Sequence, residues 1–419
     1  MCVVQWVLIA VGGLWPLIAF AGGLGFSPLL MLIAFLCFRA GAPQMKLRFY
    51  MIAIFVALEF VAASARWSPR PIHFIDIDLA KGSVAVRFEV LRVGFGLLCA
   101  MVVASAARTL SPAQARGVVR VVSIALLIQL VVVALLAAFE KQALQLFAPL
   151  MPDSGEGVQN ISRNGIIMAL AAPFLIVGMG RSLSFTRALF IEIAVFVAIT
   201  AVLFTRGVNG GIVSIAAGLT AVAVVRLFPR YGFRILGAVL AFIVVGAPLV
   251  FEYITRGADA ATATTSAEWR LAIWRRVLDV IDKDPFFGQG LGVLRTMQEK
   301  IPTGAFAGEL YVPNHAHNMV LQLWAESGAI GASLVAVAIL TAGFRMPQPR
   351  SLGVAGFLAA ALAGQFMAIA LVSFDLWNDW WWATGGILAA LIVVMARAET
   401  IDDPSRLLGP PDRTYAPSA

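Results

Sequence analysis

Two histidines separated by one residue are the side chains in this sequence best suited to acid–base chemistry. His315 and His317 lie in Asn314-His315-Ala316-His317-Asn318, directly before an apolar stretch that begins at Met319. An unperturbed imidazole has a pKa of about 6.5, so neutral His317 can accept a proton from a hydroxyl group near pH 7. We expect His317 to act as the base, and His315 and Asn318 are candidates for supporting roles.

A metal site is the alternative use of two histidines at this spacing. The third histidine, His73, is distant in the sequence, and the three cysteines have no metal-ligand spacing. Two Asp-x-Asp triplets, at 76–78 and 282–284, could hold a divalent cation. On a helix, however, residues two apart do not face each other. We therefore expect no metal and no other cofactor.

Arginines at the ends of apolar stretches are candidates for binding an anion. Arg206 lies in Phe204-Thr205-Arg206-Gly207, and Arg270 lies in the tryptophan-rich segment 268–274, which leads to a glycine-rich turn at 284–292. A guanidinium offers paired donors that match phosphate oxygens and stays charged at any relevant pH. Each arginine alone could instead anchor a helix at a membrane interface. Arg275 or Arg276 could replace Arg270 if their helix were rotated.

Three further features of the sequence are less specific. Glu326 lies nine residues after His317, about half a helical rotation away, so we expect it to face away from that histidine. Gly328 and Gly331 are typical of close helix packing in membranes. Glu59 and Glu192 fall inside apolar stretches, where an ionisable residue is either functional or a buried hydrogen-bonding group.

The composition indicates the kind of element that must position these residues. Of 419 residues, 60% are hydrophobic and only 13% are charged, and the mean hydropathy is +0.89; a soluble domain has roughly 25% charged residues. The net charge of +8 is spread between the apolar stretches and forms no basic run, which argues against nucleic acid as a partner. The sequence predicts an all-α membrane protein surrounded by lipid.

Twelve apolar stretches approach the roughly 20 residues that a membrane-spanning helix needs. They are centred near residues 12, 31, 57, 98, 130, 173, 197, 218, 243, 330, 362 and 389. The five loops after the even-numbered stretches, from the second to the tenth, carry basic residues and no acidic ones. By the positive-inside rule these loops and both termini are cytoplasmic.

The number of preceding spans places the candidate residues on one face. Arg163 follows five spans, Arg206 follows seven, and Arg270 and His317 follow nine. Odd counts share a side, so all four lie on the periplasmic face. We expect residues 1–397 to form one bundle with a long periplasmic loop at 253–317. Within that loop, a helix over 268–284 would rest its tryptophans on the membrane surface. Residues 398–419 have the composition of a disordered cytoplasmic tail.

The candidate motifs occur in the order seen in one known family. His317-Asn318, followed after nine residues by Gly328-Ala329-Ile330-Gly331, resembles the histidine motif of the O-antigen ligase and polymerase superfamily. Thr205-Arg206-Gly207 resembles that family's Ser-Arg-Gly, and the tryptophan-arginine segment ending in Pro285 and Gly288 is similar to its second arginine motif. The resemblance covers residues 195–335. It implies a membrane glycosyltransferase of GT-C-like fold in the bacterial inner membrane.

The resemblance also implies a reaction and roles for three residues. The family transfers a glycan from undecaprenyl diphosphate, so Arg206 and Arg270 would bind the diphosphate and His317 would deprotonate the acceptor. Arg163 is a further candidate contact to the diphosphate. A ligase would use lipid A core oligosaccharide as acceptor, would need no metal or nucleotide, and would invert the anomeric centre. The alternatives are an O-antigen polymerase, whose acceptor is another lipid-linked glycan, and a transporter of lipid-linked glycans.

Overall fold

A computed structural model describes residues 3–20, 25–41, 77–78, 83–84, 86–139, 142, 145, 154–180, 185–205 and 209–399. The described helices are α1 (Val3–Phe20), α2 (Phe26–Gly41), α4 (Val86–Ala107), α5 (Pro112–Ala138), α7 (Ser154–Gly180), α8 (Phe185–Thr205), α9 (Asn209–Leu227), α10 (Gly232–Ile254), α11 (Ser266–Ile281), α12 (Met319–Arg345), α13 (Gly353–Val372) and α14 (Asp379–Glu399). Two 3₁₀ turns, η3 (Val293–Thr296) and η4 (Pro349–Ser351), and a two-residue antiparallel pair, β1 (Ile77–Asp78) with β2 (Ser83–Val84), complete the described elements.

The described helices confirm a polytopic membrane protein. Seven of them are long and apolar enough to cross a bilayer, namely α5, α7, α9, α10, α12, α13 and α14, and shorter apolar segments lie in α1, α2, α4 and α8. These helices coincide with eleven of the twelve expected spans. The remaining one, near residue 57, lies outside the described residues, as does Glu59. Helix α14 continues through Glu399, and the rest of the expected tail, 400–419, is also outside them.

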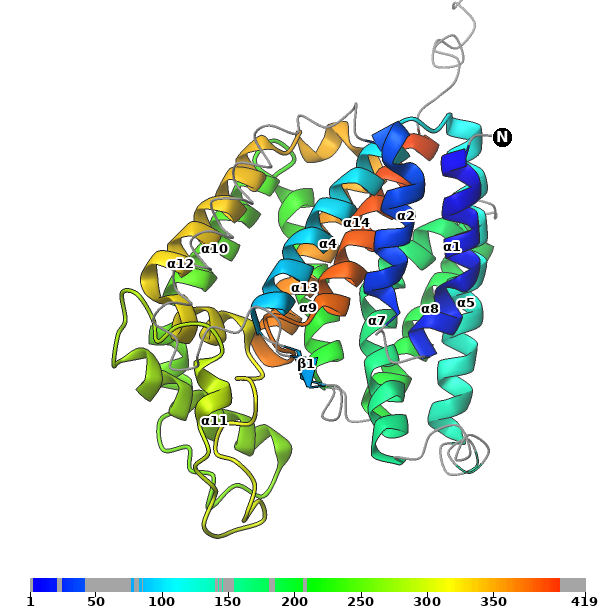
Figure 1. The fold of residues 1–419 in the computed structure, drawn as a ribbon. Helices are drawn as coiled ribbons and strands as arrows, with labels where there is room; N and C mark the ends of the chain where they lie inside the picture. The colour runs from blue at the N-terminus through cyan, green and yellow to red at the C-terminus, as the bar shows by residue number, and fades with distance from the viewer. Residues whose placement is uncertain are drawn as a thin grey trace, which may run out of the picture.

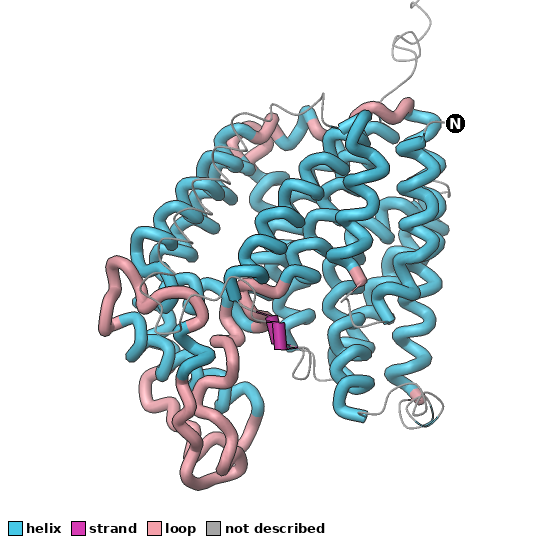
Figure 2. Tube along the Cα trace, viewed as in Figure 1, coloured by secondary structure: helices cyan, strands magenta, loops and turns pink. Residues whose placement is uncertain are grey.

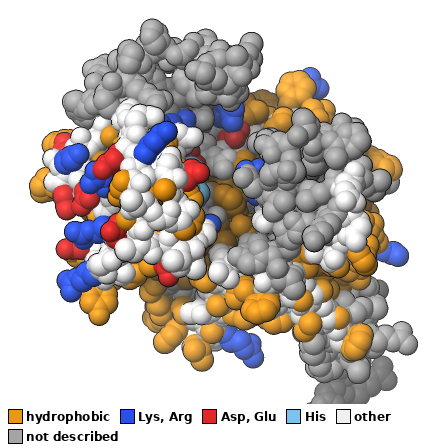
Figure 3. Space-filling model, turned by 90° about the horizontal axis from the view of Figure 1, so that it is seen from below, with side chains coloured by type: hydrophobic (Ala, Val, Ile, Leu, Met, Phe, Trp, Pro, Cys, Tyr) orange, Lys and Arg blue, Asp and Glu red, His pale blue; other side chains and the backbone are white. Residues whose placement is uncertain are grey.

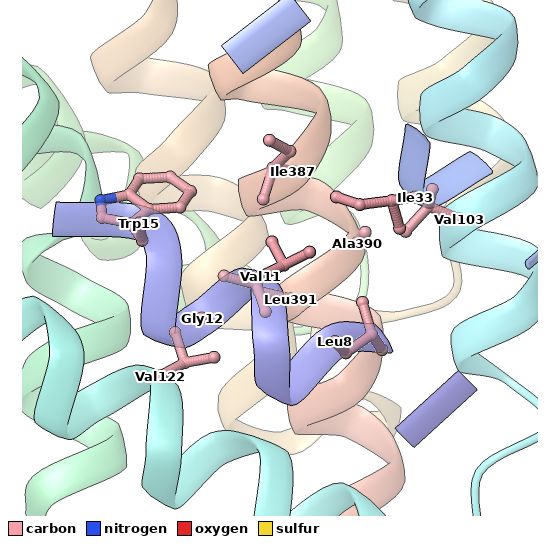
Figure 4. A pocket seen from close by; sticks show the side chains of 10 residues that line it. All are labelled: Leu8, Val11, Gly12, Trp15, Ile33, Val103, Val122, Ile387, Ala390 and Leu391. Carbon is pink, nitrogen blue, oxygen red and sulfur yellow. The ribbon is translucent and has the colours of Figure 1, made fainter. Parts of the chain in front are cut away.

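Two groups of helices are joined through a central pair (Figure 1). Helices α1, α2, α4, α5, α7, α8 and α14 share one apolar core, and α10, α11 and α12 share another. Helix α13 packs along α9, and both lie between the two groups. A cavity of about 10 Å³ in the first core is lined by apolar side chains from α1, α2, α4, α5 and α14 (Figure 4). It has room for about one water molecule, so it is not a substrate site.

The segment between α10 and α12 forms a separate lobe, which we call the loop lobe (residues 255–318). It lies at the end of the bundle opposite the start of α1, with its loops gathered around α11 (Figures 1 and 2). Helix α11 begins with a capping box, in which Thr265 and Glu268 satisfy each other's backbone N–H groups. The sequence predicts a helix here, over 268–284, and the observed helix begins two residues earlier and ends three residues earlier.

The expected membrane-surface position of the α11 tryptophans is wrong. Trp274, Leu278 and Ile281 are buried against the core that α10 and α12 share, and Trp269 stacks on Phe306 of the loop lobe with ring centroids 4.8 Å apart. The amphipathic pattern was correct, but its apolar face is covered by protein. Periodicity indicates that a face is buried and does not indicate what buries it.

Candidate active site

The histidine segment is held in place by hydrogen bonds on both sides. Asn318 caps α12, with its Oδ1 accepting the backbone N–H groups of Val320 (3.0 Å) and Leu321 (2.9 Å). The indole Nε1 of Trp274, from α11, donates to the carbonyl oxygen of Ala316 at 3.1 Å. Between these anchors, His317 has φ +50°, a left-handed conformation that costs a non-glycine residue about 1–2 kcal/mol. A strained residue held by its surroundings is typical of functional sites.

The imidazoles of His315 and His317 lie against each other. Their ring centroids are 4.1 Å apart and the rings are tilted by 55°. Neither ring has a hydrogen bond within the described part of the chain, and neither contributes a nitrogen to the buried atoms that lack a partner. Viewed from the loop-lobe end, a histidine is visible in a hollow between the charged surface of that lobe and the apolar bundle (Figure 3). The imidazole nitrogens are therefore open to a ligand.

Both histidines are neutral at pH 7. Burial lowers the pKa of His317 to about 3, and the neighbouring His315 and Arg270 act in the same direction, whereas Asp375 opposes them. The pKa of His315 is lowered chiefly by burial, against the opposing charge of Asp375. Desolvation disfavours the charged form of an imidazole. Each ring therefore offers one N–H donor and one nitrogen acceptor.

Arg270 brings an unmatched positive charge close to the histidine pair. It is half-buried on α11, and burial lowers its pKa from the ordinary arginine value. Within the described ranges no carboxylate pairs with it. By contrast, Arg276 pairs with Glu299 and with Asp279 (3.4 Å), and Arg275 is exposed. A desolvated guanidinium without a counter-charge is costly, so of these three arginines Arg270 is the one suited to an anionic ligand.

Asp375 connects the histidines to a network that was not anticipated from the sequence. It lies in the loop between α13 and α14, where its Oδ2 pairs with Nη2 of Arg295 at 2.9 Å. Its Oδ1 accepts from Gln322 Nε2 (2.9 Å) and from the backbone N–H of Trp377 (3.0 Å). Asp375 belongs to an acidic segment, 374–381, that span counting places on the same face as His317. That shared face was the one signal that could have indicated it.

Glu326 belongs to the same network and makes no direct bond to His317. Its Oε1 accepts from Gln322 Nε2 at 3.0 Å, and its Oε2 accepts from the indole of Trp377 at 2.7 Å. Gln322 also accepts the backbone N–H of Leu376 at 3.1 Å. Gln322 therefore ties α12 to the α13–α14 loop through its bonds with Asp375 and Leu376, while its bond to Glu326 stays within α12.

The interpretation of Gly328 as a helix-packing residue is wrong. Helix α12 is broken there, with φ +61° and ψ −163°, and the turn at residues 285–290 docks into the break. Gln289 N donates to Ala325 O (2.8 Å), and Ala329 N donates to Pro285 O (2.8 Å). A Cβ on Gly328 would lie 2.3 Å from the carbonyl oxygen of Phe286, and one on Gly288 would lie 2.5 Å from the Glu326 backbone. Both glycines are needed because two backbones touch.

The structure gives less information on two other expected site residues, Arg206 and Arg163. Arg206 lies outside the described residues, and so does the side chain of Glu192. Arg163 is half-buried in α7, one residue before Asn164. The Asn164 side chain bonds to Gln129 of α5 (2.9 Å) and to the carbonyl oxygen of Ala19 in α1 (2.7 Å). These bonds fix α7 in the first bundle, and a contact of Arg163 with an anionic ligand remains a prediction.

No group of three or more potential metal ligands occurs among the side chains that the structure describes. In the second Asp-x-Asp triplet, Asp284 accepts the backbone N–H of Phe287 at 3.1 Å and so shapes the docked turn. This local role accounts for Asp284 without a cation. Independence of metal stays a prediction of the sequence.

Comparison with known proteins gives the same family that the motifs resemble. Residues 193–336 match the family described as O-antigen ligase, a segment that includes Arg206, Arg270, His315 and His317. A protein of Rickettsia prowazekii (strain Madrid E) is 26% identical over 147 residues, which are 33% of this chain and 35% of that one. A protein of Rickettsia bellii (strain RML369-C) is 27% identical over 148 residues, 34% of this chain and 35% of that one.

Both relatives carry the name "Putative polysaccharide ligase". The match spans about a third of each relative's length. Over residues 193–336, this chain is similar to the O-antigen ligase family.

Proposed function

We propose that the protein transfers a polysaccharide from undecaprenyl diphosphate to a hydroxyl of lipid A core oligosaccharide, at the periplasmic face of the inner membrane. The observation that carries this proposal is the charge of Arg270, desolvated and without a carboxylate partner in the described chain, close to two neutral imidazoles whose rings are in contact. An uncompensated cation beside a neutral base suits an anionic leaving group and an uncharged nucleophile.

In the proposed reaction His317 takes the proton of the acceptor hydroxyl as its oxygen bonds to the anomeric carbon of the donor sugar. The bond from that carbon to the diphosphate breaks, and the electron pair leaves with the diphosphate. Arg270 and Arg206 stabilise the growing negative charge, the kind of electrostatic stabilisation on which enzymes commonly depend. A single displacement of this kind inverts the anomeric centre and needs no nucleotide, because the donor is already activated.

The low pKa of His317 is consistent with this order of events. In the ligand-free protein, the positive charge of Arg270 is one of the causes that keep His317 neutral. A diphosphate bound to Arg270 would offset that charge and make His317 a stronger base. Donor binding would therefore prepare the base that the acceptor needs.

Reconstituted transfer tests the proposal. Purified protein in proteoliposomes is given lipid-linked donor and either core lipid or a second donor as acceptor, without nucleotide. We expect glycan on the core lipid. His317→Ala should lower kcat by about 10²- to 10⁴-fold while leaving donor binding largely intact. Arg270→Gln should lower kcat and also weaken donor binding. Arg275→Gln, on the exposed face of the same helix, serves as the matched control.

Each other result identifies a different function. Extension of the second donor alone would identify a polymerase. Movement of donor across the membrane without a new glycosidic bond would identify a transporter. Full activity of His317→Ala would refute the proposed mechanism.

A further inference from the structure

His315 has a chemistry that the proposed reaction does not use. One base is enough to deprotonate one hydroxyl, and His317 supplies it. Yet the ring of His315 lies in contact with that of His317, and its nitrogens have no hydrogen bond from any residue in the described ranges. They also remain accessible, because they are not among the buried atoms without a partner. A polar side chain held beside the base and left unbonded is available to the substrate.

The charge state of His315 indicates which part of the substrate it fits. Burial keeps the imidazole neutral, so it presents one donor and one acceptor. A sugar hydroxyl needs one of each, whereas diphosphate oxygens only accept. The anion is served by arginine, and the cation Arg295 next to the pair is already occupied by Asp375 at 2.9 Å. The chemistry of His315 therefore matches a saccharide hydroxyl.

The spacing of the two rings indicates that His315 binds a hydroxyl adjacent to the one that reacts. Ring centroids 4.1 Å apart place the two imidazoles within reach of neighbouring groups on a single sugar. Hydroxyls on adjacent ring carbons lie about one hydrogen-bond length apart, so two touching imidazoles can each bond one of them. The backbone fixes this spacing, since the carbonyl oxygen of Ala316, between the histidines, is bound by Trp274 at 3.1 Å.

We propose that His315 and His317 bind two neighbouring hydroxyls of the acceptor sugar, His317 the hydroxyl that reacts and His315 the one beside it. The inference rests on the proposed function and makes His315 a determinant of acceptor specificity. The nucleophile is then one member of a vicinal diol. The proton of the reacting hydroxyl goes to His317, while the second hydroxyl keeps its proton and exchanges only hydrogen bonds with His315.

Acceptors that lack one hydroxyl at a time test this. Transfer is measured to lipid A core oligosaccharides whose terminal sugar has been replaced by each of its monodeoxy forms. With wild-type protein, removing the nucleophile abolishes transfer, and removing the hydroxyl next to it lowers kcat/KM by roughly 10- to 100-fold, as expected for an unpaired polar group in a desolvated site. Removing more distant hydroxyls has little effect.

Variants of His315 then test whether this residue binds the second hydroxyl. His315→Phe keeps a ring against His317 but has no nitrogen, so the ratio between the full acceptor and the neighbouring deoxy acceptor should fall to near 1. His315→Gln, which has both a donor and an acceptor, should retain part of that ratio. A purely structural role would lower transfer to both acceptors equally and leave the ratio unchanged, and that result would overturn the inference.

The failure of the inference differs from the failure of the proposed function. If wild-type protein extends the full acceptor and tolerates loss of the neighbouring hydroxyl, the diol inference is wrong and the ligase proposal stands. If wild-type protein makes no product from the full acceptor, the ligase proposal itself is wrong.

Discussion

The pH dependence of transfer is the sharpest consequence of the buried histidine pair. With a pKa of about 3, His317 is about 99% neutral at pH 5, whereas a histidine with the ordinary pKa of about 6.5 would be only roughly 3% neutral there. The value of kcat/KM reports the ionisation of the free enzyme. We therefore expect it to stay nearly constant from pH 7.5 to pH 5, where an unperturbed histidine would cause a drop of about 30-fold.

The assay is steady-state transfer to core lipid in nanodiscs at a series of pH values, with donor well below its KM. Arg270→Gln provides an internal check, because the charge of Arg270 is one cause of the lowered pKa of His317. Removing that charge should move the acid limb of the profile to higher pH. A wild-type midpoint between pH 6 and 7 would refute the assignment of a desolvated, neutral His317.

Loss of folded protein must be separated from loss of activity in this experiment. The folded-state pKa of His317 is below its unfolded value, so the unfolded chain binds a proton that the folded chain does not as the pH falls from about 6.5 towards 3. Stability therefore decreases in that window, by about 2 kcal/mol at pH 5 for this one group. Protein held at pH 5 and then assayed at pH 7.5 should recover full activity, which confirms that the fold survives.

Two further predictions concern the docked turn and metal. Gly328→Ala should destabilise the protein by about 1–3 kcal/mol, because this backbone conformation is essentially restricted to glycine and the added Cβ would clash with the backbone of Phe286. Thermal unfolding in detergent measures this loss. The control is Gly246→Ala, whose Cβ meets only the Phe242 ring at 3.9 Å and which should leave the unfolding temperature nearly unchanged. Transfer should persist after EDTA treatment and dialysis, because the arginines neutralise the diphosphate; recovery of activity only on adding back Mg²⁺ or Mn²⁺ would contradict that expectation.

The helices were predictable from sequence because a lipid-facing helix needs a long apolar stretch. The same logic predicted which candidate residues share a face, since span counting requires only the order of the spans. It placed Arg270 and His317 on one side, and the structure brings the charge of Arg270 close enough to lower the pKa of His317. The contact between the rings of His315 and His317 was not predicted, and only the structure shows it.

The features that were not predictable depend on contacts between distant segments. The break at Gly328 looks like ordinary helix packing in the sequence, because nothing local shows that a turn forty residues earlier will dock there. The network around Asp375 joins η3, α12 and the α13–α14 loop, and each member looks unremarkable in its own segment. The burial of the α11 tryptophans depended on the loop lobe folding back onto α12.

These long-range contacts determine the position of Arg270 relative to His317 in the proposed site. Arg270 belongs to α11, whereas His317 directly precedes α12, so their relative position depends on how α11 and the turn after it are held against the start of α12. Besides the apolar core that α11 shares with α12, three connections hold these segments: the Trp274 bond to Ala316, the turn docked at Gly328, and the ion pair of Arg295 with Asp375 in the α13–α14 loop.

The docked turn is the only one of these three connections that involves no titratable or aromatic side chain. It consists of backbone hydrogen bonds between residues 285–290 and 325–330. A methyl group added at Gly328 would push the docked turn away from the backbone of α12, and we expect this to move α11, with Arg270, relative to His317. A glycine eleven residues from the proposed base can therefore affect kcat without touching either substrate.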